Sequence, residues 1–142
     1  MVAQDYARTY RANAVLTASP GQLVLMLYDG ALRALGLARE AFTRPPGDLR
    51  RLEAINTQLI KAQQIINQLQ GTLNFDAGDG QFAREMQRLY DYYLRRLLEA
   101  NLRKQVEPVV EVERLLGEVR DAWAEMLRNQ DPAQARPARS VA

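Results

Sequence analysis

The sequence predicts an all-α protein, folded as an antiparallel up-down four-helix bundle. In four long segments the apolar residues recur at alternating spacings of three and four, as on the buried face of an amphipathic helix. Short stretches rich in proline, glycine, asparagine and aspartate separate these segments. Helices of about 30 to 38 Å that are joined by short turns pack most simply as antiparallel neighbours.

The first expected helix begins after Ser19 and runs to about Arg44. Ser19 is a suitable N-cap, Pro20 occupies the first helical position, and Gln22 completes a capping box. The Pro-Pro-Gly sequence at 45–47 ends the helix. Its apolar residues cover more than one buried stripe. Either this helix is central and deeply buried, with the segment before Ser19 covering part of it, or part of its surface binds a partner.

The second expected helix follows directly. Asp48 is positioned to cap it, and it continues to about Leu73. The spacing of its apolar residues predicts a seam packed along a near-parallel partner helix. This seam consists of Leu52, Ile55, Leu59, Ala62, Ile66, Leu69 and Leu73.

The third and fourth expected helices complete the bundle. A turn-forming connector at 74–80 leads to the third, at 81–102, and Pro108 lies just inside the start of the fourth, which ends near Leu127. The expected core residues of the third helix are Phe82, Met86, Leu89, Tyr93, Leu97 and Ala100. Those of the fourth are Val109, Val112, Leu116, Val119, Trp123 and Met126.

These boundaries divide the chain into three parts. Residues 1–18 form an N-terminal segment that we expect to pack against the bundle, and residues 19–128 form the bundle itself. Residues 129–142 are polar, contain prolines and lack any helical periodicity. We therefore expect a disordered C-terminal tail.

One face of the second expected helix is poor in charge. Lys61 is the only charged residue between Ala54 and Phe75, although 25% of the whole chain is charged. Amides surround apolar centres on the flank that would face water, which consists of Asn56, Ile60, Gln63, Asn67 and Gln70. Because amides cost less to bury beneath a partner than charges do, this pattern indicates either a protein interface or a solvated amide face.

The third expected helix carries surplus apolar residues beside its core seam. Tyr90, Leu94 and Leu98 follow one another at spacings of four, and Leu102 continues the row. Residues at this spacing lie on one face of a helix. They either widen the core or line a groove on a flank that we expect to be half exposed.

Composition limits the functions that this chain can perform. Its 142 residues are enough for one domain of ordinary size, and they include no cysteine and no histidine. The lack of cysteine removes thiolate nucleophiles and zinc–thiolate sites, and the lack of histidine removes the usual general base and the commonest metal ligand. We therefore expect no enzyme activity, no cofactor and no metal.

Charge and hydropathy argue against nucleic-acid binding and membrane insertion. The net charge is +2, because 19 cationic residues are interleaved with 17 anionic ones. This distribution lacks the concentrated basic patch of a nucleic-acid-binding protein. No apolar run is long enough to span a bilayer, and the amino terminus lacks the apolar region of a signal peptide. We expect a cytosolic protein.

Four motifs stand out along the chain, namely TASPGQLVLMLYDGAL at 17–32, KAQQIINQLQGTLN at 61–74, LYDYYLRRLLEAN at 89–101 and DAW at 121–123. In this order and spacing they resemble the motifs of the FliS family of flagellin export chaperones. Together with Tyr10 near the amino terminus, the resemblance extends over about residues 6–127. It implies a small antiparallel helical bundle with the amino-terminal segment folded against it.

The resemblance also implies a function. Chaperones of this family bind the disordered carboxy-terminal region of flagellin in the cytosol, prevent premature polymerisation and support delivery to the flagellar type III export apparatus. By the same resemblance, Tyr10 docks at the export gate. From helical geometry we expect the flagellin-binding groove to include Ile60, Asn67, Tyr90, Leu94 and Leu98.

Oligomeric state separates this function from the main alternative. A flagellin chaperone is expected to be monomeric when free and to form a one-to-one complex with its client. The alternative is a generic homodimeric helical-bundle adaptor, whose surplus apolar face is covered by a second copy of the chain.

Overall fold

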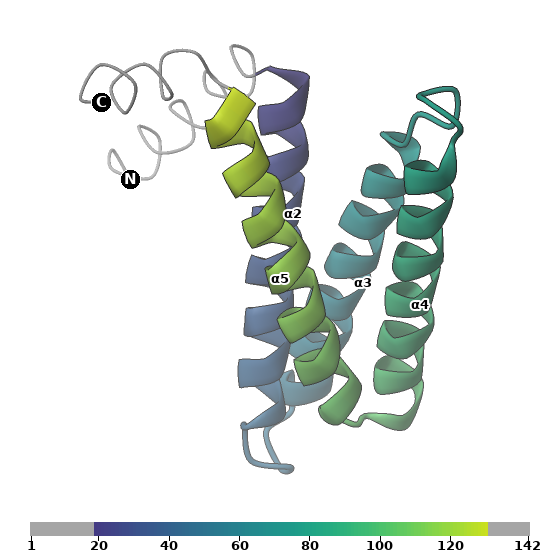
Figure 1. Ribbon diagram of the computed structural model, residues 1–142. Coiled ribbons are helices and arrows are strands. Elements are labelled where there is room, and N and C mark those ends of the chain that lie inside the picture. Colours follow the sequence, from purple (N-terminus) through teal and green to yellow (C-terminus); the bar gives the residue numbers. More distant parts are fainter. Residues whose placement is uncertain (1–18, 131–142) are drawn as a thin grey trace, which may run out of the picture.

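The computed structural model describes residues 19–130 and confirms the all-α bundle. Its four helices are α2 (Pro20–Phe42), α3 (Arg50–Gly71), α4 (Gln81–Arg103) and α5 (Glu107–Gln130). Successive helices run in opposite directions (Figure 1). Around the bundle, α2 packs on α3 and α5, and α4 packs on the same two helices, so that α2 and α4 lie diagonally opposite. The expected N-terminal segment at 1–18 and most of the expected tail lie outside the described residues.

The helix boundaries follow the signals in the sequence. The capping box of α2 is confirmed: the Ser19 hydroxyl accepts a hydrogen bond from the Gln22 amide at 3.2 Å, and the Gln22 side chain accepts one from the Ser19 amide. At the start of α3, a carboxylate oxygen of Asp48 accepts from the Arg50 amide at 2.9 Å. α5 continues to Gln130, three residues beyond its expected end at Leu127, and Pro108 lies in its first turn as predicted.

Gly80 makes the turn into α4 possible. It adopts a positive φ of 76°, a left-handed conformation that is costly for residues with a side chain. A Cβ at this position would lie 2.7 Å from the carbonyl oxygen of Phe75. The chain therefore reverses direction between α3 and α4 at a point where only glycine fits without strain.

The core consists mainly of the residues predicted from periodicity. The buried side chains of α3 are Ile55, Leu59, Ala62, Ile66 and Leu69, and those of α5 include Val109, Val112 and Leu116. Four predicted residues of α4 are also buried, namely Met86, Tyr93, Leu97 and Ala100. The partly buried Val119 and Trp123 of α5 pack against this core. The four helices thus enclose one continuous apolar core.

Three predictions about the core were wrong. Leu52 and Phe82 are exposed, because each lies in the first turn of its helix, at an end of the bundle where few neighbours cover it. Leu89 is exposed as well, because α4 turns the next residue, Tyr90, into the core. Tyr90 follows the first of the two alternatives given for its row: this side chain is 2% exposed and widens the core.

None of the helices within residues 19–130 has the length and apolar character needed to cross a membrane.

Candidate protein-binding surface

The outer surface shared by α3 and α4 carries most of the residues predicted to form a groove. We define the α3–α4 surface by Ile60, Asn67, Leu94 and Leu98. Two side-chain hydrogen bonds connect the helices beside it: the Asn101 amide donates to the Asn56 carbonyl at 2.8 Å, and the Gln70 amide donates to an Asp91 carboxylate oxygen at 2.6 Å. Because the helices are antiparallel, Ile60 and Leu98 lie at similar levels between these two bonds.

Two apolar side chains of the α3–α4 surface are open to a partner. Ile60 is 40% exposed and Leu98 is 51% exposed. Leu94 is partly buried and packs against the core, while Asn67 is exposed. One turn beyond Leu98, Leu102 continues the row on α4 and is also exposed. The result is an apolar strip along α4 that faces Ile60 across the seam between the two helices.

Tyr90 differs from the other predicted groove residues. Its ring lies inside the bundle, where its hydroxyl forms a hydrogen bond of 2.5 Å with that of Tyr28. This bond joins the diagonally opposed helices α2 and α4. Burial raises the pKa of both hydroxyls, and the hydrogen bond with Tyr28 raises the pKa of Tyr90 further. Both groups therefore stay neutral, and the pair acts as a structural link rather than as an acid or base.

The amides of α3 have a role that the sequence analysis missed. Two members of the amide flank, Asn56 and Gln70, make hydrogen bonds to α4 instead of facing solvent alone. Each interaction joins side chains far apart in the sequence, so helical periodicity alone could not identify it. The uncharged character of this face is thus partly explained by contacts within the protein. Of its other members, Ile60 and Asn67 are exposed and Gln63 is partly exposed, so these three remain available to a partner.

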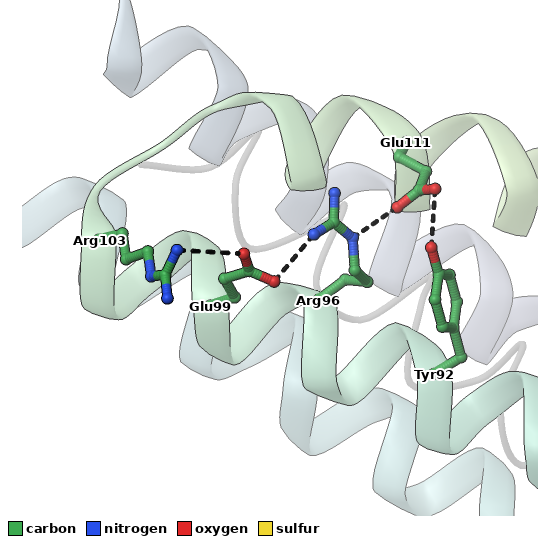
Figure 2. Close-up of polar contacts among 5 residues, drawn as sticks. All are labelled: Tyr92, Arg96, Glu99, Arg103 and Glu111. Carbon is green, nitrogen blue, oxygen red and sulfur yellow. Dashed lines mark hydrogen bonds and ion pairs between the residues drawn. The ribbon is translucent and has the colours of Figure 1, made fainter.

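The seams on either side of α5 are closed by charged groups. Figure 2 shows the chain of contacts between α4 and α5: the Tyr92 hydroxyl donates to Glu111 at 2.8 Å, Arg96 donates to Glu111 at 2.7 Å, and Arg96 also pairs with Glu99. Hydrogen bonds from Arg96 and Tyr92 lower the pKa of the Glu111 carboxyl, so it stays charged to lower pH than an ordinary glutamate.

The seam between α2 and α5 is closed in the same way. Arg39 pairs with Glu113 at 2.8 Å, and Arg120 pairs with Asp29 at 2.8 Å. Within residues 19–130, no ion pair crosses from α3 to α4. The α3–α4 surface therefore has exposed aliphatic side chains beside a seam without ion pairs, where α3 and α4 are joined by one amide–amide and one amide–carboxylate hydrogen bond. The faces beside α5, by contrast, are closed by ion pairs.

A cavity, which we call the end cleft, lies at the end of the bundle where α2 begins and the chain turns from α3 into α4. Its volume is about 230 Å³. The side chains that line it are mostly apolar or aromatic and include Val24, Tyr28, Leu73, Phe82, Tyr90 and Trp123. The indole N–H of Trp123 donates to the Gly21 carbonyl at 2.9 Å, which fixes the ring beside α2. The cleft could not be predicted from the sequence, because its walls come from three helices, α2, α4 and α5, and from the connector that follows α3.

Neither the α3–α4 surface nor the end cleft contains a cluster of catalytic or metal-binding groups. In the part of the chain that the structure describes, no group of three acidic, cysteine or histidine side chains is arranged to hold a metal ion. Tyr10, the predicted gate-docking residue, lies outside the described residues. What both regions offer is apolar surface bordered by hydrogen-bonding groups, as protein interfaces do.

Comparison with known proteins identifies the family. The family model described as "Flagellar protein FliS" matches residues 2–130. The flagellar secretion chaperone FliS of Bacillus subtilis (strain 168) is 37% identical over 130 residues, which cover 92% of each chain. The protein of the same name from Salmonella typhimurium is 42% identical over 122 residues, 85% of this chain and 86% of the relative.

A third relative agrees with these two. The flagellar secretion chaperone FliS of Escherichia coli (strain K12) is 40% identical over 134 residues, 91% of this chain and 94% of the relative. These are names of chaperones, which confirms the expectation that the chain is not an enzyme. The chain belongs to the FliS family of flagellar secretion chaperones.

Proposed function

We propose that this protein is a cytosolic export chaperone that binds the disordered carboxy-terminal region of flagellin. By covering that region it prevents premature polymerisation, and it supports delivery to the flagellar type III export apparatus. One observation carries the choice of binding face: Ile60 and Leu98 are exposed together on a helix pair whose rim is formed largely by amides. Family membership supplies the link to flagellar secretion.

The chemistry of the α3–α4 surface suits a segment that folds as it binds. An amphipathic helix places its apolar side chains on an apolar strip, and part of the favourable binding free energy is offset by the loss of conformational entropy as the segment folds. The exposed side chains of Ile60 and Leu98 provide anchors for such a helix. The amides beside them can satisfy polar groups of the partner, and burying an amide costs much less than burying a charge.

Tyr90 belongs to this proposal in a different way from the exposed residues. Its buried ring lies one turn before Leu94 along α4 and also lines the end cleft. We assign it to the floor of the binding region, where it supports the residues that touch flagellin. Asn67 is exposed on α3 and is assigned to the polar rim.

The N-terminal segment at 1–18 is proposed to act in delivery and in control of access. Tyr10 is assigned to docking at the export gate, on the basis of the family resemblance. The segment continues directly into α2, whose residue Val24 lines the end cleft. From that attachment point a short segment can reach the cleft and Tyr90, which we assign to the floor of the binding region, so the same residues are proposed to act as a lid over the flagellin-binding groove.

The test is a titration of the purified protein with a peptide from the carboxy terminus of the flagellin of the same organism. Sedimentation should show a monomer when the protein is free and a one-to-one complex with flagellin. Flagellin that lacks its carboxy-terminal segment should not bind. A stable dimer that ignores flagellin would instead support the homodimeric adaptor. Removal of residues 1–16 should raise affinity for the peptide if the segment acts as a lid.

A further inference from the structure

The outer side of α4 carries two arginines beside the apolar row of the α3–α4 surface. Arg88, Asp91, Leu94 and Arg95 line a shallow hollow that is open to solvent. At 100° per residue, Arg88 and Arg95 lie on the edge of the row that points away from α3. A partner that covers Leu94 and Leu98 would therefore pass directly beside both guanidinium groups.

These two arginines are available to a partner. Neither forms an ion pair with a carboxylate in residues 19–130, whereas Arg96, on the side of α4 that meets α5, pairs with Glu99 and Glu111. The nearest acid in the hollow, Asp91, accepts a hydrogen bond from Gln70 at 2.6 Å and is held towards α3. The Arg95 guanidinium lies over the Tyr92 ring, 5.9 Å from its centre, which keeps it close to the surface of α4.

The two edges of the α3–α4 surface therefore differ in charge. The α4 edge carries Arg88 and Arg95, both exposed. The α3 edge carries Ile60 and Asn67, and its one acidic residue, Glu53, lies about two turns before Ile60 on the same face. Lys61 is turned 100° from Ile60, away from α4. A partner helix with acidic groups along one edge only would match this asymmetry.

We propose that Arg88 and Arg95 select an amphipathic partner helix with an acidic edge and fix the direction in which it binds. This inference rests on the proposed function, because it concerns the segment that docks on the α3–α4 surface. Seven residues, about 10.5 Å, separate the two arginines along α4, so the matching carboxylates lie about two turns apart on the partner. Reversal of the partner would move its acidic edge over the amides of α3 and leave both arginines unpaired. The arginines thus determine polarity, and the leucines provide anchoring.

An acidic helix fits this site better than a nucleic acid does. The arginines lie beside the exposed side chains of Leu98 and Leu102. A charged phosphate backbone bound to the arginines would not remove these apolar side chains from water. A partner helix covers those leucines with its own apolar side chains and reaches the arginines with its edge. Exposed charge pairs of this kind act mainly on the rate of association and on specificity.

The test measures the association rate of the flagellin carboxy-terminal peptide at low, physiological and high salt. The double variant R88E/R95E is compared with R33E/R44E, which changes the net charge equally at exposed arginines that form no ion pair within the described residues. We expect R88E/R95E to slow association about tenfold at low salt and R33E/R44E less than about twofold. The difference should shrink as salt screens the charges. A peptide whose acidic residues are replaced by their amides should bind both double variants equally.

A third variant, Leu98→Asp, separates this inference from the proposed function. If Leu98→Asp abolishes binding but R88E/R95E behaves like R33E/R44E at every salt concentration, the inference is overturned and the proposed function stands. If neither Leu98→Asp nor R88E/R95E weakens binding, the proposed face and the inference fail together. A single-stranded oligonucleotide serves as a further probe. Suppose that the wild type binds the oligonucleotide, that R88E/R95E does not, and that both bind the peptide equally. The arginines would then be assigned to nucleic acid, and the inference would be overturned.

Discussion

At the scale of single residues, Leu98 is the clearest test of the binding face. It is 51% exposed, so its side chain contributes little to the fold. Leu98→Asp should weaken binding of the flagellin peptide by more than about tenfold, because an unpaired charge would be buried beneath the partner. Isothermal titration calorimetry measures the affinity, and circular dichroism shows whether the helices persist.

Leu37→Asp is the matched control for that experiment. Leu37 is 44% exposed on α2 and lies away from the α3–α4 surface. Leu37→Asp introduces the same charge as Leu98→Asp at a similarly exposed position. Because this position lies outside the binding face, the affinity of Leu37→Asp for the peptide should equal that of the wild type. Equal losses of affinity in the two variants would show that charge in general, rather than position, reduces binding. Leu94 is a less suitable site, because it packs against the core.

The Tyr28–Tyr90 hydrogen bond gives a second prediction at this scale. Tyr90→Phe leaves the buried Tyr28 hydroxyl without its partner, and the free energy of unfolding should fall by about 1 to 3 kcal/mol. The double variant Y28F/Y90F should lose less than the sum of the two single variants, because it leaves no buried hydroxyl unpaired. Urea unfolding at neutral pH measures all three. Strict additivity would mean that the hydroxyls do not depend on each other.

At the scale of elements, the turn between α3 and α4 depends on Gly80. Gly80→Ala should lower the free energy of unfolding by about 1 to 2 kcal/mol, because its backbone is left-handed and the new Cβ would clash with the Phe75 carbonyl. Gly71→Ala is the control, since a Cβ there meets no atom within 4 Å at the end of α3. That variant should be neutral or slightly stabilising. Thermal unfolding of both variants checks the difference, and equal effects would contradict it.

The seam between α4 and α5 predicts a dependence on pH. The pKa of Glu111 in the folded protein is lowered from its usual 4.5, first by the hydrogen bond from Arg96 and then by that from Tyr92. Its stabilising contribution is therefore complete above about pH 4.5 and is lost as the pH falls through the lower folded value. Glu111→Gln should be less stable than the wild type at neutral pH, and the two should converge in acid. Urea unfolding at several pH values tests this, and a constant difference would contradict it.

Local signals predicted the helices well, but contacts between helices were harder to predict. Ser19, Pro20 and Pro108 marked helix starts correctly, because capping depends on neighbouring residues only. The core seam of α4 was misplaced at Leu89, since the rotation of a helix about its axis depends on its neighbours. The same limit applies to the binding region: exposed Ile60 and Leu98 follow from periodicity, whereas the buried Tyr90 and the end cleft follow from tertiary packing.

At the scale of the whole molecule, the bundle has two kinds of seam. Ion pairs such as Arg96–Glu111 and Arg120–Asp29 connect α5 to α4 and α2, while side-chain amides connect α3 to α4. A partner on the α3–α4 surface would contact two helices at once, and it would do so only when they are folded together. Binding should therefore stabilise the bundle as a whole, because a ligand that binds only the folded state raises the free energy of unfolding.

The size of this stabilisation depends on how far the free peptide concentration exceeds the dissociation constant. With free peptide at about 100 times its dissociation constant, the free energy of unfolding should rise by about 2.7 kcal/mol. Differential scanning fluorimetry at increasing peptide concentrations follows the change as a rising melting temperature. Leu37→Asp should show the same rise as the wild type. For Leu98→Asp, at the same peptide concentrations, the free energy of unfolding should rise by about 1.4 kcal/mol at most, because its dissociation constant is expected to be more than tenfold higher. If the peptide lowered the melting temperature, it would bind unfolded chains in preference to the bundle, and the groove would lose its role in recognition.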